Sequence, residues 1–199
     1  CDGELWYRGY RVETLINGLG PEEMGFEKIA YLLLMGEMPD DGTLEEFVDL
    51  IGKCRTLPTN FTRDVIMKAS SRDIMNSMTR SILTLASYDR NALDTSVSNS
   101  LRQCIKLISE FPLLAIYGYH AYNYYEKQDS MIIHRPNHKL STAENLLMML
   151  RPNKKFTATE AKVLDTALIL HMEHGGGNNS TFTTRVVTSS GSDTYSTIA

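Results

Sequence analysis

Apolar residues recur at helical spacing along most of the chain. In residues 26–33 they stand at i, i+3, i+4 and i+7, which places them on one face of an α-helix. Similar spacing returns further along the sequence. The stripes are Phe26, Ile29, Ala30 and Leu33; Leu44, Phe47, Val48 and Ile51; Met75, Met78, Ile82, Leu85 and Ala86; Leu146, Leu147 and Leu150; and Ala161, Leu164, Ala167, Leu168 and His171. The pattern predicts several helices, each with one buried face.

Residues that favour helix ends stand at the edges of these stripes. Pro21 and the two glutamates after it open the first helix, Gly36 follows its last turn, and Asp73 can cap the Met-rich helix. Capping boxes, in which a Ser or Thr and the Glu three residues later satisfy first-turn amides, precede three other stripes. These boxes are Thr43 with Glu46, Ser141 with Glu144, and Thr157 with Glu160.

The longest periodic segment covers residues 96–127 and contains Pro112. Because proline lacks an amide hydrogen and clashes with the preceding turn, we expect a kink or break there. We expect the tyrosines of its second half to pack in the core or an interface, with an aromatic binding surface as the alternative. They are Tyr117, Tyr119, Tyr122, Tyr124 and Tyr125. The pattern in residues 60–68 predicts a short helix. The pattern in residues 128–139 predicts a loop.

Strand signals are weak, and residues 5–12 predict at most a short edge strand. There is no alternation of strands with helices and no internal repeat, so the predicted fold class is all-α. A length of 199 residues with 42% apolar residues fits about one domain with a packed core.

Charge and composition exclude several kinds of partner. The net charge is −4 with both signs mixed along the chain, so we expect no nucleic-acid partner. No apolar run approaches the ~20 residues that cross a bilayer, so we expect no membrane span. Cys1, Cys54 and Cys104 match no metal or redox motif, which favours reduced thiols and a cytoplasmic location. The start at Cys1 and the helix beginning near Asp193 lead us to expect a piece of a longer protein.

The segment HMEHGGGNNS, residues 171–180, is the candidate site. His174 ends a helix-patterned run, and three glycines then allow the backbone to lie close to a ligand. Asn178 and Ser180 add neutral polar groups within one turn. One imidazole beside open backbone and neutral polar groups indicates a pocket for a small anionic molecule that carries a carbonyl.

Three other interpretations of this segment stay open at this point. It can be a helix end with a glycine cap and no ligand. His171 and His174 with Glu173 can form a metal site, although no third ligand stands at a recognised spacing. The His-Gly-Gly-Gly string also occurs in esterase oxyanion loops, but the G-x-S-x-G elbow of those enzymes is absent from this sequence. His134 and His138 are a weak metal pair because Pro136 separates them. We therefore expect no metal.

Four segments resemble citrate synthases of the bacterial type, over nearly the whole chain. They are WYRGY at 6–10, FEKIAYLLLMGEMP at 26–39, LEEF at 44–47, and VLDTALILHMEHGGGNNSTFTTRVVTSSGSDTYSTIA at 163–199. The first three match packing segments of that family, and the last is the most specific. The resemblance implies that His174 binds oxaloacetate, that Asn178 lines the same pocket, and that Ser180 supports a catalytic histidine further along the chain.

The resemblance also implies an activity and its substrates. Citrate synthases condense acetyl-CoA with oxaloacetate to give citrate and CoA, the first step of the tricarboxylic acid cycle. They are acyltransferases that convert the acyl group into an alkyl group on transfer. Acetyl-CoA is a substrate, so no cofactor is implied. The expected assembly is a homodimer. The alternatives are a 2-methylcitrate synthase, which uses propionyl-CoA, and a non-catalytic helical scaffold.

Other parts of the family pattern are absent from this sequence. The family's G-P-x-H-G-G-A-N segment with its catalytic histidine would follow Ala199, as would the catalytic aspartate, the arginines that bind carboxylates and the coenzyme A site. We therefore expect residues 1–199 to be part of the large helical domain, without the small domain and the C-terminal half. No complete catalytic set is expected in this chain, which by itself should be inactive.

Overall fold

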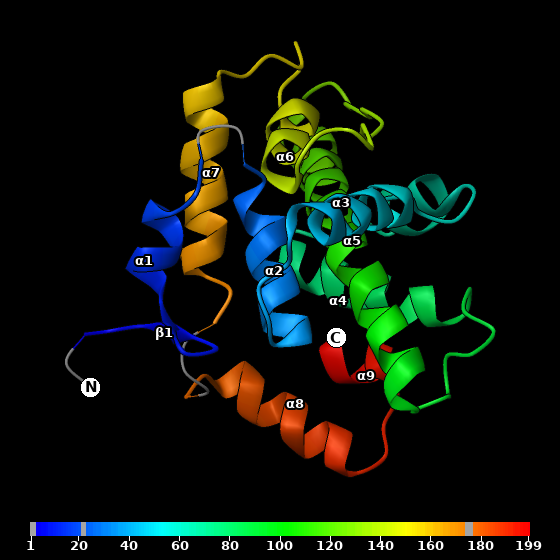
Figure 1. The fold of residues 1–199 in the computed structure, drawn as a ribbon. Helices are drawn as coiled ribbons and strands as arrows, with labels where there is room; N and C mark the ends of the chain where they lie inside the picture. The colour runs from blue at the N-terminus through cyan, green and yellow to red at the C-terminus, as the bar shows by residue number, and fades with distance from the viewer. Residues whose placement is uncertain (1–2, 21–22, 174–176) are drawn as a thin grey trace.

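The computed structural model describes residues 3–20, 23–173 and 177–199. Helices build almost all of it, so the all-α class is confirmed (Figure 1). The strands of the described ranges form one antiparallel hairpin, β1 (Trp6–Tyr7) with β2 (Tyr10–Arg11), where a single short edge strand over residues 5–12 was predicted. The helical elements are α1 (Val12–Asn17), α2 (Gly25–Met35), α3 (Asp41–Cys54), the π-helical turn η1 (Thr62–Met67), α4 (Ile74–Ala86), α5 (Val97–Lys127), α6 (Thr142–Leu150), α7 (Ala158–Leu170), α8 (Asn179–Ser189) and α9 (Thr194–Ile198).

Helix α5 is the centre of the fold. It packs against α3, α4, α6 and η1, and its own buried residues form much of the main core. The helix runs through Pro112 without the predicted break. Pro112, Leu113 and Leu114 are all buried between neighbouring helices, and this packing offsets the one hydrogen bond that the proline removes.

Three of the predicted helix starts are confirmed and two are wrong. Helix α2 begins at Gly25, so Glu23 precedes the helix that it was predicted to open, while Pro21 and Glu22 lie outside the described residues. The boxes of α6 and α7 are both complete, and Asp73 caps α4 by accepting a bond from the Asn76 amide at 3.1 Å. The cap of α3 is Asp40, not Thr43. The Asp40 carboxylate accepts a bond from the Thr43 amide at 2.8 Å. A carboxylate interacts better than a hydroxyl with the positive end of the helix dipole, so the helix begins earlier.

The buried face of α4 also differs from the prediction. Met75 is 70% exposed, whereas Ser77 and Ser81 are buried beside Ile82 and Leu85. Ser81 satisfies its hydroxyl by bonding the Ser77 carbonyl oxygen at 2.8 Å. The face of α4 that is buried therefore carries Ser77 and Ser81 and is turned away from the first methionine.

The tyrosines of α5 divide between core and surface. Tyr117 is buried, and its hydroxyl donates to the His134 carbonyl oxygen at 2.8 Å. Tyr119, Tyr124 and Tyr125 are exposed. Tyr117 therefore has the core packing role that was predicted, whereas the three exposed tyrosines do not pack in the core.

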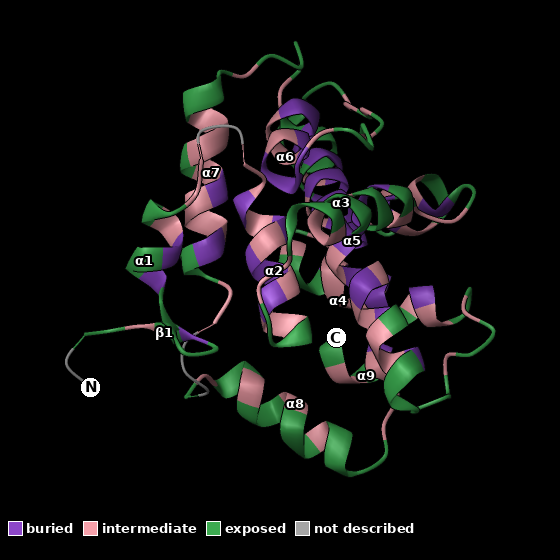
Figure 2. Cartoon of the chain, viewed as in Figure 1, coloured by how far each residue is buried: buried purple, intermediate pink, exposed green. Residues whose placement is uncertain are grey.

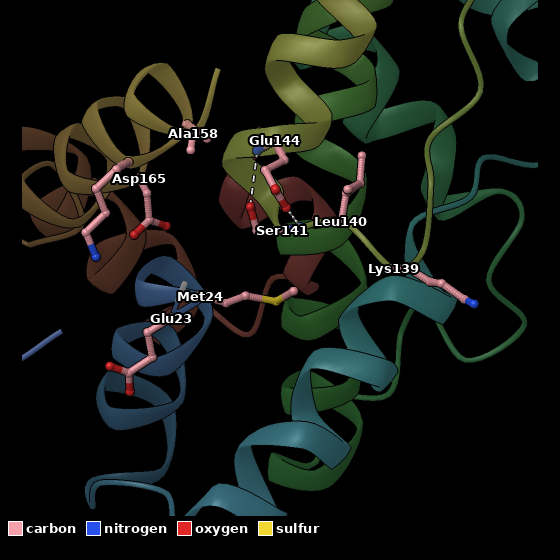
Figure 3. A pocket seen from close by; sticks show the side chains of 10 residues that line it. Glu23, Met24, Lys139, Leu140, Ser141, Glu144, Ala158 and Asp165 are labelled. Carbon is pink, nitrogen blue, oxygen red and sulfur yellow. Dashed lines mark hydrogen bonds between the residues drawn. The ribbon is translucent and has the colours of Figure 1, made fainter. Parts of the chain in front are cut away.

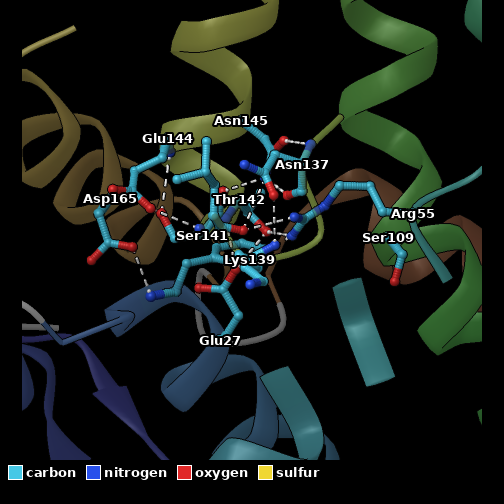
Figure 4. Close-up of polar contacts among 12 residues, drawn as sticks. Glu27, Arg55, Ser109, Asn137, Lys139, Ser141, Thr142, Glu144, Asn145 and Asp165 are labelled. Atoms are coloured by element: carbon cyan, nitrogen blue, oxygen red, sulfur yellow. Dashed lines mark hydrogen bonds and ion pairs between the residues drawn. The ribbon is translucent and has the colours of Figure 1, made fainter. Parts of the chain in front are cut away.

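A buried polar network joins α2, the end of α3 and the start of α6 (Figure 4). Glu27 accepts bonds from the amide and the hydroxyl of Thr142, both at 2.7 Å. Arg55 donates to the Thr142 hydroxyl at 3.1 Å and lies 3.7 Å from the Glu27 carboxylate. Burial raises the pKa of Glu27, while the Thr142 bonds and the Arg55 charge oppose that shift. The network fixes three helices at one point.

The last helices are placed differently from the rest. Helix α7 lies beside α2 and α6, whereas α8 runs along the outside of the bundle and contacts α9 (Figure 1). None of the residues of α8, all of which are described, is buried (Figure 2). Helix α9 is held to the bundle by the buried Tyr195, whose hydroxyl donates to Asp89 at 2.9 Å. No helix of the described ranges is long and apolar enough to span a membrane.

Candidate functional site

The candidate site lies where α7 ends and α8 begins. His174, the central residue of the predicted pocket, lies outside the described residues together with Gly175 and Gly176. The structure therefore describes the two sides of the site, which are the end of α7 up to Glu173 and the start of α8 from Gly177.

The start of α8 brings Asn178 and Ser180 together. Asn178 is the cap of the helix, and its side-chain oxygen accepts a bond from the Ser180 amide at 2.6 Å. This cap uses the acceptor end of the amide, so Nδ2 is the end that can donate to a ligand. Asn178 is half-buried and Ser180 is exposed. Both side chains lie at the positive end of an 11-residue helix, which favours an anionic ligand there.

The end of α7 corrects one expectation. His171 was predicted to pack against the apolar stripe, but it is exposed, and its Nδ1 lies 2.7 Å from the Ala167 carbonyl oxygen. The buried residues of α7 are Asp165 and Ile169, four residues apart on one face. His171 is two residues beyond Ile169, which is about 200° around the helix, so it faces away from the core.

Sequence reasoning missed Tyr7 as part of this region. Its ring is fully buried, and its hydroxyl donates to the Ile169 carbonyl oxygen at 2.7 Å. A second, longer contact of 3.4 Å reaches the Glu173 carbonyl oxygen. The sequence signal for Tyr7 was the WYRGY segment, which was interpreted only as a packing segment. The contact joins residues 162 positions apart, and no local pattern indicates it.

Two histidines outside the candidate site, His134 and His120, have structural partners, and the third, His138, is exposed. The Nε2 atom of His134 lies 3.1 Å from the Arg151 carbonyl oxygen and 3.2 Å from that of Pro152. The buried His120 similarly bonds the Met149 carbonyl oxygen at 3.1 Å. Within the described ranges, no three His, Cys, Asp or Glu side chains gather as a metal site would require.

The cavities that lie away from the candidate site include one polar and one apolar space beside α2 and α6. A polar cavity of 420 Å³ opens between the start of α2, the start of α6 and α7, with Glu23, Glu144 and Asp165 in its wall (Figure 3). Lys139 and Lys162 line the same cavity, so its wall carries both signs of charge. An apolar cavity of 520 Å³ lies between α2, α5 and α6, and Ile198 of α9 is part of its wall. Neither cavity is lined by Asn178 or Ser180.

Two buried carboxyl groups belong to the packing of the helices. Asp165 accepts a bond from the Phe26 amide at 2.9 Å and so satisfies the start of α2, while burial raises its pKa. Glu110 of α5 is fully buried, and burial raises its pKa to about 7 despite Lys106 at 3.9 Å. Glu110 lies on α5, which packs against α3, so it is within the bundle and apart from the α7–α8 site.

Comparison with known proteins identifies relatives along the whole chain. The family model described as "Citrate synthase, C-terminal domain" matches residues 1–199. A citrate synthase of Synechocystis is 32% identical over 100% of this chain and 47% of its own length. The citrate/2-methylcitrate synthase of Bacillus subtilis is 28% identical over 96% of this chain and 48% of its own. The chain thus spans about half the length of the curated relatives it matches.

Solved structures give the same result for the fold. The citrate synthase of Pyrobaculum aerophilum has a TM-score of 0.83 at 28% identity, covering 99% of this chain and 48% of that one. A citrate synthase of Thermoplasma acidophilum has a TM-score of 0.84 at 24% identity, over 98% of this chain and 48% of that one. That structure is described as a ternary complex with carboxymethyl coenzyme A and oxaloacetate.

Proposed function

This chain belongs to the citrate synthase family, and from that premise we propose that it forms the oxaloacetate-binding side of an enzyme that condenses acetyl-CoA with oxaloacetate to citrate and CoA. One observation carries the proposal. The segment that resembles the oxaloacetate-binding turn of the family, residues 171–180, joins the end of one helix to the capped start of the next. A dicarboxylate with a reactive carbonyl fits such a site, because helix amides and neutral donors stabilise its charge.

In this proposal each residue of the turn has a distinct role. His174 donates a hydrogen bond to the oxaloacetate carbonyl and polarises it, so that the carbon is more easily attacked. Asn178 lines the pocket from the cap of α8, and Ser180 in the first turn supports the catalytic histidine. The reaction needs no resident metal or organic cofactor, since acetyl-CoA is consumed as a substrate.

We further propose that the remaining catalytic groups lie in the half of the relatives that this chain does not span. The base that removes a methyl proton from acetyl-CoA and the acid that polarises its thioester would both come from there, as would the small domain. The apolar cavity beside Ile198 supports this arrangement. An apolar space of 520 Å³ between helices is suited to side chains from a further segment and is a poor place for water.

A 2-methylcitrate synthase is the second candidate. The relatives described as a citrate/2-methylcitrate synthase of Bacillus subtilis and as a 2-methylcitrate synthase of Corynebacterium glutamicum are both 28% identical to this chain. The citrate synthases in the comparison have similar identities, so similarity does not separate the two acyl substrates. A non-catalytic helical scaffold is the third candidate, and an activity assay separates it from the other two.

A thiol-release assay tests the proposed function. A form of the protein as long as its relatives should release CoA from acetyl-CoA only when oxaloacetate is present. Residues 1–199 alone should release none, because they lack the proposed base and acid. Propionyl-CoA as the preferred substrate would favour the second candidate. Turnover by residues 1–199, free of host enzyme, would show that the catalytic groups are assigned to the wrong half.

We also propose that the protein forms a homodimer through the outer face of α8. Phe182 and Val186 stand one turn apart on this helix and are 69% and 51% exposed. An exposed aromatic ring beside an exposed valine on a helix that packs loosely against its own bundle indicates a surface that another subunit can cover. The proposed location of this dimer is the cytoplasm.

Replacing Phe182 by Asp should weaken self-association by about tenfold or more, because a charge would have to be buried at the contact. The control is Thr188→Asp, since Thr188 is exposed about 240° around the same helix. Sedimentation velocity over a concentration series gives both dissociation constants. Equal association of Phe182→Asp and the unsubstituted protein would exclude this face of α8 as the dimer contact.

A further inference from the structure

We propose that Tyr7 is a positioning residue for the oxaloacetate pocket, acting through the end of α7. The inference rests on the proposed function, because it concerns the same site. Tyr7 touches no substrate in this proposal. Its hydroxyl holds the end of α7, the helix that precedes His174 in the sequence.

The contacts of Tyr7 support this role. Its hydroxyl donates to the Ile169 carbonyl oxygen at 2.7 Å, in the last turn of α7. The same oxygen atom lies 3.4 Å from the carbonyl oxygen of Glu173, the residue directly before His174 in the sequence. One buried hydroxyl therefore spans the last helical turn and the residue that leads into the pocket.

Tyr7 is itself held by a fixed frame. In the β-hairpin it is paired with Tyr10, and the Val12 amide donates to the Leu5 carbonyl oxygen at 3.0 Å. Arg8 follows with a left-handed φ of 49°, and its guanidinium donates twice to the Leu33 carbonyl oxygen, at 3.2 and 2.8 Å. Leu33 is in the last turn of α2. The hairpin thus connects the end of α2 to the end of α7.

Besides Tyr7, the end of α7 is capped by His171, whose Nδ1 lies 2.7 Å from the Ala167 carbonyl oxygen. The backbone of this C-cap residue has φ −100° and ψ 2°, which is not the left-handed turn that commonly satisfies the last carbonyls of a helix. There is no basic residue in the last turn of α7. The Ile169 carbonyl oxygen does accept a second bond, from the Met172 amide at 3.2 Å. Removing the Tyr7 hydroxyl would therefore loosen the end of the helix without leaving that carbonyl unpaired, so the fold should survive.

Hydrogen exchange of residues 1–199 tests the positioning directly. Tyr7→Phe keeps the buried ring and removes only the hydroxyl. Amides of residues 170–178 should exchange about five- to tenfold faster in this variant, as expected for the loss of one buried hydrogen bond. The matched control is Tyr10→Phe, because Tyr10 is its hairpin partner and is exposed. Unchanged exchange in Tyr7→Phe would overturn the proposal.

Kinetics of the form as long as the relatives test the consequence for the substrate. Tyr7→Phe should raise the KM for oxaloacetate about five- to tenfold while the KM for acetyl-CoA stays the same. A merely structural role would lower the melting temperature and leave the oxaloacetate KM unchanged, and that result would overturn the assignment. A complete lack of condensing activity in the unsubstituted form would contradict the proposed function instead, and the exchange experiment would still decide whether Tyr7 holds the end of α7.

Discussion

Replacing His174 by alanine in a form as long as the relatives is expected to lower kcat about 100- to 1,000-fold. The proposed role of the imidazole is to donate a hydrogen bond to the oxaloacetate carbonyl as negative charge develops on that oxygen. Loss of one such donor in a site that excludes water typically costs ~3–4 kcal/mol of transition-state stabilisation. Steady-state kinetics with oxaloacetate and acetyl-CoA measures the effect.

His171→Ala is the matched control for this experiment. The sequence alone led us to expect a loss of stability from this change, because His171 was predicted to pack in the core. The exposed position of His171 changes that expectation, and its removal should alter both kcat and the melting temperature only slightly. Near-normal kcat and oxaloacetate KM in His174→Ala would mean that the glycine-capped helix end, without a ligand, is the better interpretation.

Replacing Glu27 by alanine is expected to destabilise the protein by about 3–5 kcal/mol. Glu27 accepts the hydrogen bonds that the amide and the hydroxyl of Thr142 donate. Its carboxylate also lies 3.7 Å from the buried guanidinium of Arg55. Its removal leaves that guanidinium buried without a counter-charge. The burial stays unfavourable because an arginine side chain cannot become neutral by losing a proton. The free energy of unfolding by urea measures the loss.

Glu46→Ala provides the control for Glu27→Ala. Glu46 lies on the exposed face of α3, and its loss should change the free energy of unfolding by less than about 0.5 kcal/mol. If Glu27→Ala were no more destabilising than Glu46→Ala, then Arg55 would have another effective partner, and the network would not hold α2, α3 and α6 together.

Features that depend on near neighbours in the sequence were predictable. The boxes of α6 and α7 join residues three positions apart, so their sequence pattern predicts the contact itself. The capping box predicted for α3 was wrong, and the reason also lies within one turn of the sequence. Asp40 and Thr43 both offer a cap within one turn, and the pattern does not say which of them the helix selects. The all-α class followed from the repeated apolar stripes.

Features that depend on distant residues were not predictable from local patterns. The place of Met75 on the surface depends on which face of α4 the neighbouring helices cover, and that face carries Ser77 and Ser81. Pro112 continues its helix because surrounding helices bury it. The contact of Tyr7 with α7 arises only when residues 162 positions apart in the sequence meet in the fold. For the candidate site, the spacing of residues indicated a small anionic ligand, and the resemblance to a family supplied the identity of that ligand.

A structure of the form as long as the relatives, determined with oxaloacetate, tests the central claim most directly. The account predicts oxaloacetate between the end of α7 and the start of α8, with its carbonyl oxygen about 3 Å from the His174 imidazole and with Asn178 in the pocket wall. Oxaloacetate bound elsewhere, with His174 and Asn178 both out of contact, would contradict the assignment of the site.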